Sequence, residues 1–213
     1  MSDLFTGTTS ILSNRELFFE IFNAQDEDDL LKVMEDHPDI FDDGNWKPLG
    51  DNRSNYGIVK NQQSNPIAAL IEKVTNSIDA LLTKKCYELG IDPKNPAAPQ
   101  SMKEAIEKFY PNNNWDLKSQ RRAQAEEIQI IADGKGPRSN RTNHPTSVVV
   151  YDNGEGQHPK DFENTFLSLV RGNKNNVHFV QGKYNMGGSG SIVFCGKKRY
   201  QLIASKKYDG TGD

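Results

Sequence analysis

The sequence has little cysteine and no long hydrophobic run. Two cysteines among 213 residues are too few for a disulfide framework or a zinc site built from thiolates. No run of about 18 apolar residues is present, which argues against a membrane-spanning helix. The first residues contain neither a basic start nor an apolar stretch, which excludes an ordinary secretory signal. We therefore expect a soluble, cytoplasmic protein without membrane partners.

The composition is that of a folded domain with an uneven charge distribution. Hydrophobic residues make up 35% of the chain and the net charge is −3, so no global excess of positive charge points to nucleic acid. Residues 26–43 contain nine acidic residues against Lys32 alone, whereas residues 171–207 contain eight basic residues and no acidic one. A solvated surface is the usual explanation of such runs. A surface that faces phosphates is the alternative for the basic run.

Helix signals are clear in the first 90 residues. Ser13 and Glu16 have capping-box spacing, and Asp26 can cap a second helix that His37-Pro38 would end. Residues 42–64 are rich in Gly, Asn and Asp and predict a loop. A longer helix is predicted between the Asn65-Pro66 start and Gly90. Its apolar residues fall in one stripe, which predicts the core-facing side: Ile67, Leu70, Ile71, Val74, Ile78, Leu81 and Leu82.

The rest of the chain predicts a mixture of strands and short helices. Prolines interrupt residues 91–122, which resemble an insertion with one short helical pattern. The β-rich runs 128–131 and 147–151 are expected to pair as antiparallel strands. Pro159 is expected to open another helix, and residues 199–205 are strand-like.

Three motifs carry residues suited to phosphate chemistry. On the long helix, Glu72, Asn76 and Asp79 share one face, as a water-activating carboxylate beside a magnesium ligand would; an ordinary solvated face is the alternative. Asp152-Asn-Gly-Glu-Gly156 follows a strand and places a carboxylate and two glycines where a flat ligand can approach, although it also suits a tight turn. Residues 182–191 are rich in glycine and can present N–H groups to phosphates, or serve as a flexible connector.

In this order the three motifs resemble the GHKL ATPases, the superfamily of gyrase, HtpG-type chaperones, histidine kinases and MutL. Residues 72–80 resemble the N box, residues 152–156 the D-x-G-x-G box, and residues 182–190 the second glycine box. The MORC and chaperone-like branches look most similar. The resemblance implies an α+β fold, a two-layer sandwich in which a mixed, mostly antiparallel sheet is covered by helices on one face. It predicts residues 1–64 as an N-terminal segment and residues 65–213 as the ATP-binding domain.

The resemblance also implies ATP and Mg²⁺ as ligands and a role for each motif residue. Glu72 would be the general base, Asn76 the magnesium ligand, and Asp79 a supporting or water-mediated contact. Asp152 would accept a hydrogen bond from the adenine amino group, with Gly154 and Gly156 beside the base. Residues 157–190 would form a mobile lid. Its expected phosphate contacts are Lys183, Gly187, Gly188 and Gly190, with Arg171 as a further candidate.

Two features separate this chain from compact members of the superfamily. The spacing from Glu72 to Asp152 is long, and no transducer domain follows residue 213, so a fragment or stand-alone module with slow turnover is expected. Glu72 favours hydrolysis over histidine-kinase phosphotransfer, because those kinases usually have Asn at this position. ATP-dependent homodimerisation, or engagement of a protein partner or DNA through a missing region, is the expected outcome of binding. The alternatives are a nucleotide-gated module with negligible hydrolysis and a DNA-associated ATPase subunit of a repair or defence system. A third alternative, from another class, is a nucleic-acid-binding module that uses the basic residues 171–207 and needs no nucleotide.

Overall fold

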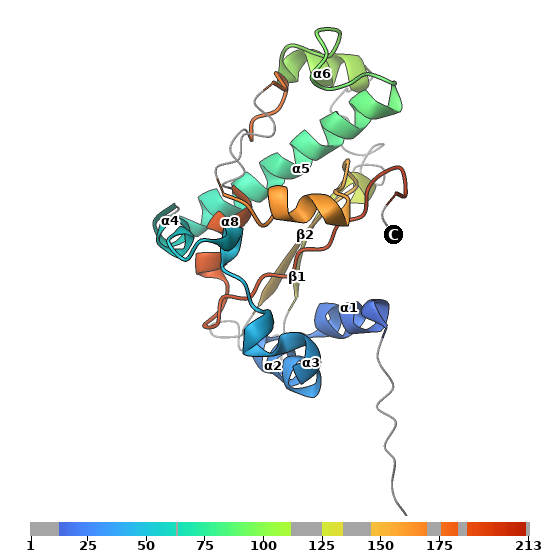
Figure 1. Cartoon of the computed structure of the whole chain (residues 1–213). Helices are drawn as coiled ribbons and strands as arrows, with labels where there is room; N and C mark the ends of the chain where they lie inside the picture. Colours follow the sequence, from blue (N-terminus) through green and yellow to red (C-terminus); the bar gives the residue numbers. More distant parts are fainter. Residues whose placement is uncertain are drawn as a thin grey trace, which may run out of the picture.

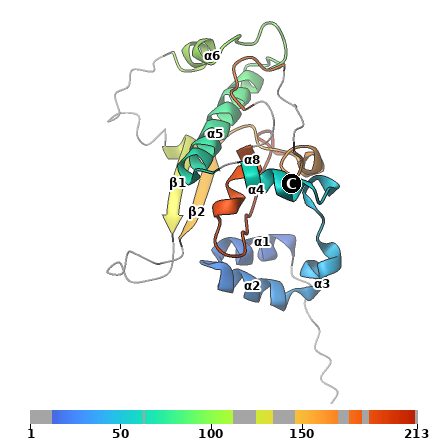
Figure 2. The same cartoon turned by 90° about the vertical axis from the view of Figure 1, so that its left-hand side faces the viewer.

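The structure is a computed structural model that describes residues 13–62, 64–111, 125–133, 146–169, 176–182 and 187–211. A long helix, α5 (Pro66–Glu88), runs through the molecule (Figure 1). The N-terminal helices lie at one end of the fold and α6 (Met102–Phe109) at the other, as both ribbon views show (Figures 1 and 2). A two-stranded sheet lies between them, beside α5.

The N-terminal helices begin where their caps predict. Helix α1 (Asn14–Asn23) has a complete capping box, in which the Ser13 side chain accepts from the Glu16 N–H and Glu16 accepts from the Ser13 N–H. Asp26 caps α2 (Glu27–Asp36) by accepting from the Asp29 N–H. Pro38 then starts the short helix α3 (Pro38–Phe41). These local signals need only neighbouring residues, which is why the sequence predicts them correctly.

The prediction of a loop over residues 42–64 is wrong in part. Two short 3₁₀ turns, η1 (Asp43–Asn45) and η2 (Leu49–Asp51), are followed by the helix α4 (Asn55–Gln62). Val59 is buried in this helix, and α4 packs against α8 (Gly187–Gly190). Tertiary packing therefore overrides the weak helix propensity of an Asn- and Gly-containing segment.

Helix α5 has the predicted ends, but only part of the predicted core face is buried. Asn65 caps it through the N–H groups of Ile67 and Ala68, and Gly90 follows its end with φ +69°. Ile67 and Ile71, predicted to be in the core, are 68% and 60% exposed. The buried residues instead lie mostly toward the C-terminal half of the helix: Ala69, Ser77, Asp79, Leu81, Leu82, Thr83 and Cys86. Leu81 and Leu82 of the predicted stripe are buried, so the prediction is right for these two residues and wrong for Ile67 and Ile71.

The core joins α5 to two segments that follow it in the chain. Leu82 and Cys86 of α5 pack with buried residues of the α6 region and of residues 177–180: Ala98, Ala105, Val177, Phe179 and Val180. The Phe109 and Phe179 rings meet edge to face with centroids 6.5 Å apart. Residues 91–111, predicted to lie in an insertion, thus contribute to the main hydrophobic cluster. Their packing fixes the chain directly before Gln181 and Gly182.

The sheet consists of β1 (Ile128–Asp133) and β2 (Ser147–Asp152), which pair in the predicted antiparallel manner. Ile128 lies opposite Asp152, and Ile130 opposite Val150. The class is therefore α+β, with a small sheet in the described part of the chain. Residues 199–205 form no strand, contrary to the prediction, and the helix expected from Pro159 is the 3₁₀ helix η3 (Pro159–Asn164). A further 3₁₀ turn, η4 (Ile192–Phe194), follows α8.

The stacked pair Tyr87 and Tyr208 gives the fold a predicted alkaline pH dependence. Their ring centroids lie 5.6 Å apart, and burial raises the pKa of Tyr87 to about 12. The unfolded chain has a tyrosine pKa of about 10. The folded state therefore keeps its proton longer, and this stabilising contribution is present below pH about 10 and lost as the pH rises toward about 12.

We expect the urea midpoint to fall less in Tyr87→Phe than in the wild type when the pH is raised from 9 to 11.5, because the variant has no hydroxyl to titrate at this position. The ring is 39% exposed, so solvent screening reduces the size of this difference. Tyr151→Phe, on a side chain 45% exposed, is the matched control. An equal loss in the wild type and Tyr87→Phe would show that Tyr87 contributes nothing to the pH dependence.

Candidate functional site

The three predicted residues of α5 do lie on one face of the helix, but that face is not a solvated one. Glu72 and Asn76 are half-buried, and Asp79 is completely buried. Burying a carboxylate is costly unless hydrogen bonds satisfy it. The alternative of an ordinary solvated face is therefore wrong for Asp79.

Backbone N–H groups satisfy the Asp79 carboxylate. The Gln181 N–H donates to both carboxylate oxygens, at 3.0 Å each, and the Gly182 N–H donates to Oδ2 at 2.7 Å. Hydrogen bonds to charged groups contribute about 1.5–3 kcal/mol each. Asp79 thus fixes the position of the chain at residues 181–182, and both of its oxygens already accept protein N–H groups.

Gly182 lies against the same helical face and leaves no room for a side chain. A Cβ at this position would lie 2.7 Å from Asn76 Oδ1 and 3.3 Å from Asp79 Oδ2. The segment before the glycine-rich region is therefore seated directly on Asn76 and Asp79. Glycine is required because of this close approach and not because of an unusual backbone angle.

The Asp152–Gly156 segment contacts α5 at Ala80 and Lys84, which follow Asp79 along the helix. Asp152 Oδ1 accepts from the Gly154 N–H at 3.0 Å, which orients this half-buried carboxylate. Gly154 is buried so closely against Ala80 that a Cβ would collide with the alanine side chain. The Glu155 N–H donates to the Ala80 carbonyl at 3.1 Å, and the Lys84 ammonium donates to the Asn153 carbonyl at 2.9 Å.

Gly156 marks a crossing of two chain segments. Its φ is +61°, and a Cβ there would collide with the Lys206 carbonyl. The Tyr208 N–H donates to the Glu155 carbonyl at 2.9 Å, and the Gln157 N–H donates to Ser205 Oγ at 2.8 Å. The left-handed backbone and the close approach both require glycine here. Residues 205–208 therefore hold the far side of the turn.

The third motif also lies on α5, as far as it is described. Lys183 and Arg171, two predicted phosphate contacts, lie outside the described residues. Gly187, Gly188 and Gly190 form the short helix α8, which contacts both α5 and α4. All three motifs, separated by up to about a hundred residues in the chain, thus converge on one helix (Figure 1).

Lys73 is a neighbouring charged residue that the motif analysis did not single out. Burial lowers the pKa of its ammonium group, while the nearby Cys195 and Glu72 act in the opposite direction. Burial likewise raises the pKa of the Cys195 thiol. The sequence offers no signal for this pair, because the two residues lie on segments far apart in the chain. Lys73 therefore places a half-buried ammonium group next to Glu72 on the helix.

A cavity of about 250 Å³ lies on another side of the Asp152–Gly156 turn. It is lined by Tyr87, Glu155, Gly156, Gln157, His158, Asp161, Lys207 and Tyr208. Gly156 is the one predicted site residue among them. Within the described ranges no cluster of three or more His, Cys, Asp or Glu side chains could hold a metal ion. A protein site with one amide ligand, as predicted for Asn76, would not form such a cluster.

An α+β domain in which a carboxylate–amide helix face, an Asp-containing glycine turn and a glycine-rich segment meet has the organisation of a nucleotide-binding ATPase domain. Residues 64–211 match the family model described as "Histidine kinase-, DNA gyrase B-, and HSP90-like ATPase". The chain therefore belongs to this family and contains a GHKL-type ATPase domain. No curated protein and no solved structure matches the chain. Among the described residues, no helix is both long and apolar enough to cross a membrane.

Proposed function

We propose that this domain binds ATP with Mg²⁺ over the polar face of α5 and hydrolyses it. The convergence of the three motifs on α5 is the observation that carries the proposal. Closure of residues 157–190 over the nucleotide would then promote dimerisation or engagement of a protein or DNA partner. Turnover by this chain alone is expected to be slow.

Glu72 and Asn76 are proposed to have different roles in the reaction: Glu72 acts on the attacking water and Asn76 binds the metal ion. Glu72 would orient the attacking water and accept its proton. Asn76 would offer its amide oxygen to Mg²⁺, a cation that neutralises phosphate charge and accepts few protein ligands. The Gly182 position beside Asn76 Oδ1 supports this role, because it brings the glycine-rich segment to the metal ligand.

Asp79 is proposed to act by positioning and not by direct contact with the metal. Its oxygens already accept from Gln181 and Gly182, so it holds the segment that leads into Lys183 and Gly187. Backbone N–H groups of Gly187, Gly188 and Gly190, with the Lys183 ammonium, would contact the β- and γ-phosphates. Precise placement of such groups supplies most of the catalysis in phosphoryl transfer.

Asp152 is proposed to select adenine. The Gly154 N–H holds Oδ1, which leaves Oδ2 in a defined direction to accept from the adenine amino group. Gly154 and Gly156 would keep the base close to the turn. A keto group in place of the amino group would face the carboxylate with no donor, so GTP should bind more weakly than ATP.

The test is a calorimetric titration of ATP in magnesium buffer into the wild type and Asp152→Ala. Loss of one charge-assisted hydrogen bond should weaken affinity about ten- to a hundred-fold, equivalent to about 1.5–3 kcal/mol. Asp39→Ala, at an exposed position of α3, is the matched control and should bind as the wild type does. Equal affinity in the wild type and Asp152→Ala would remove Asp152 from the site.

A further inference from the structure

The acidic N-terminal segment contacts the basic part of the chain through one side chain. Glu27, the first residue of α2, accepts hydrogen bonds from the backbone of a turn about 170 residues later. That turn, residues 196–199, carries Lys197, Lys198 and Arg199. The nine-carboxylate run of residues 26–43 and the basic run of residues 171–207 thus meet in the fold.

Three successive backbone N–H groups converge on the Glu27 carboxylate. The Lys197 N–H donates to Oε2 at 3.0 Å, and the Lys198 and Arg199 N–H groups donate to Oε1 at 2.7 and 3.2 Å. Successive N–H groups that point into one concavity form an anion-binding nest. A carboxylate already occupies this one, which shows that the turn accepts an anion.

The backbone of the turn is shaped for this occupant. Gly196 has φ +41°, and a Cβ there would collide with the Glu27 carboxylate. Arg199 has φ +63°, a conformation that costs a non-glycine residue free energy. The Arg199 guanidinium donates to Tyr56 Oη at 3.0 Å, which holds the residue against α4. The hydrogen bond to Tyr56 at one end of the turn and Gly196 at the other hold the backbone that presents the three N–H groups.

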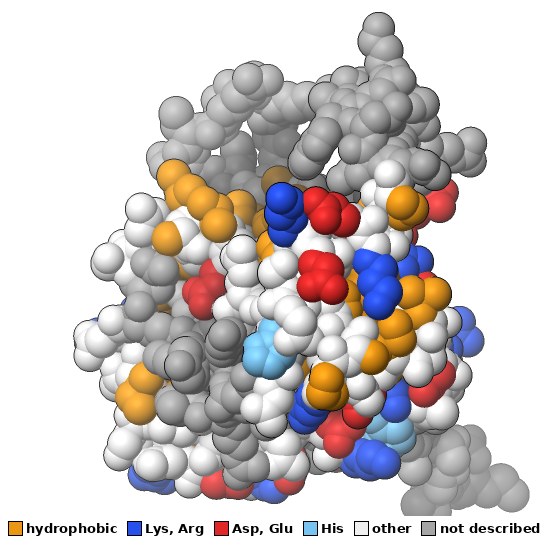
Figure 3. Space-filling model, turned by 90° about the horizontal axis from the view of Figure 1, so that it is seen from above, with side chains coloured by type: hydrophobic (Ala, Val, Ile, Leu, Met, Phe, Trp, Pro, Cys, Tyr) orange, Lys and Arg blue, Asp and Glu red, His pale blue; other side chains and the backbone are white. Residues whose placement is uncertain are grey.

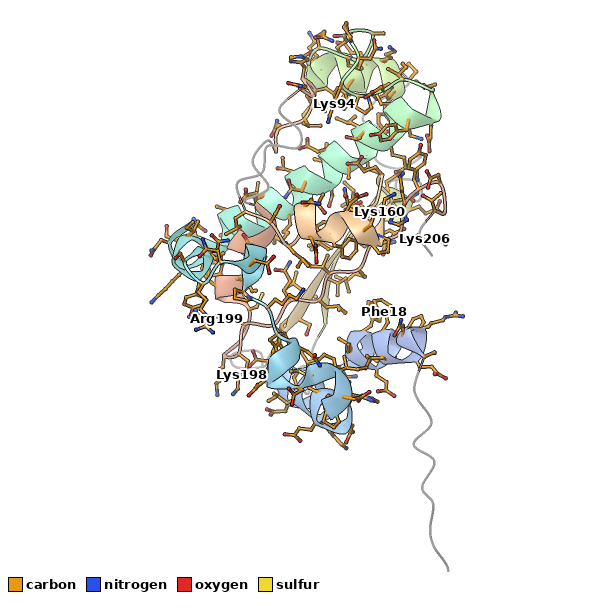
Figure 4. All side chains as sticks on the ribbon, viewed as in Figure 1. Phe18, Lys94, Lys160, Lys198, Arg199 and Lys206 are labelled. Carbon is orange, nitrogen blue, oxygen red and sulfur yellow. The ribbon has the colours of Figure 1, made fainter. Side chains whose placement is uncertain are left out.

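The flanking ammonium groups are available to a ligand. Lys197 and Lys198 are exposed, and neither makes an ion pair with another described residue. Lys198 and Arg199 lie beside α2 at the edge of the molecule (Figure 4). On the face that is seen from above the orientation of Figure 1, by contrast, Lys/Arg and Asp/Glu side chains are interspersed among the described residues (Figure 3).

We propose that the turn 196–199 is a binding site for a backbone phosphate of a nucleic acid, and that Glu27 occupies it in cis. A backbone phosphodiester carries one negative charge, as a carboxylate does, and its two non-bridging oxygens can accept all three N–H groups. Lys197 and Lys198 would neutralise the neighbouring phosphates of the same strand. The acidic residues around Glu27 act as an intramolecular competitor, so strand binding requires α2 to leave the turn.

The test is fluorescence anisotropy of a labelled 20-nucleotide single strand, without ATP or Mg²⁺, so the outcome does not depend on the proposed ATP site. Glu27→Gln keeps an acceptor for the nest but removes the charge, and we expect it to bind about tenfold more tightly than the wild type. Glu35→Gln removes one exposed charge from the same helix without touching the nest and is the matched control. Equal gains from both variants would overturn the proposal, because net charge alone would then explain them.

A second variant keeps the test valid if Glu27→Gln disturbs the fold. Replacing Lys197 and Lys198 by Ala leaves all three backbone N–H groups in place. We expect this double variant to weaken strand binding and to reduce the slope of log affinity against log salt by about 1–2. An unchanged slope and affinity would place the binding surface elsewhere and contradict the proposal.

Discussion

Glu72→Gln is expected to lower the turnover number for ATP hydrolysis by about 10²–10⁴-fold, because the amide cannot accept a proton from the attacking water. Nucleotide affinity should change little, since Gln has the same shape and Asp152 and the glycine segment remain. Phosphate release at saturating ATP measures the first quantity and calorimetry the second. The combination of lost turnover and retained binding is characteristic of a general base.

The matched control for Glu72→Gln is Glu88→Gln on the same helix. Glu88 is exposed and pairs with Lys85 at 2.8 Å, outside the proposed site. Its replacement should leave turnover unchanged. Measurable turnover that is equal in the wild type and Glu72→Gln would contradict the role of Glu72 as the general base. Negligible turnover in both proteins, with ATP binding retained, would support the nucleotide-gated module instead.

Asp79→Ala is expected to reduce the free energy of unfolding by about 2–5 kcal/mol. The substitution leaves the Gln181 and Gly182 N–H groups without their acceptor at a completely buried position. Urea denaturation at pH 7 measures the loss. Where enough folded protein remains, ATP affinity should fall as well, because the segment leading to Gly187 loses its anchor on α5.

Two controls separate a positioning role of Asp79 from a general effect of mutation. Asp79→Asn retains one acceptor oxygen and should lose less stability than Asp79→Ala. Asp36→Ala, at an exposed position in α2, should change stability by less than about 0.5 kcal/mol. Normal stability and normal ATP affinity in Asp79→Ala would show that the buried hydrogen bonds do not hold the site.

Local features of the fold could be predicted from the sequence because they depend on neighbouring residues. The capping box at Ser13, the Asn65-Pro66 start of α5 and the β1–β2 pairing all follow from short patterns. The order of the three motifs, together with their residue types, also identified the family that the comparison confirms.

The features that failed or were missed depend on contacts between distant segments. The exposed Ile67 and Ile71 show that an apolar stripe does not by itself say which part of a helix is covered. Asp79 contacts residues about a hundred positions away, and Glu27 contacts residues about 170 positions away. Periodicity and spacing carry no information on such contacts. The one available signal was Asp79 itself, an aspartate between the apolar residues Ile78 and Ala80 of a helix, which needs hydrogen-bond partners if it is buried.

The most direct test of the proposed nucleotide site is NMR of the wild type with Mn²⁺ and ATP, because Mn²⁺ accepts the same oxygen ligands as Mg²⁺ and broadens nearby amide signals. The strongest broadening is predicted at Asn76, Asp79, Gln181 and Gly182, with none at Asp39 in α3. Asp152→Ala should weaken the effect at the same ATP concentration. Broadening centred instead on Tyr87, His158 and Tyr208, around the separate cavity, would contradict a site on the polar face of α5.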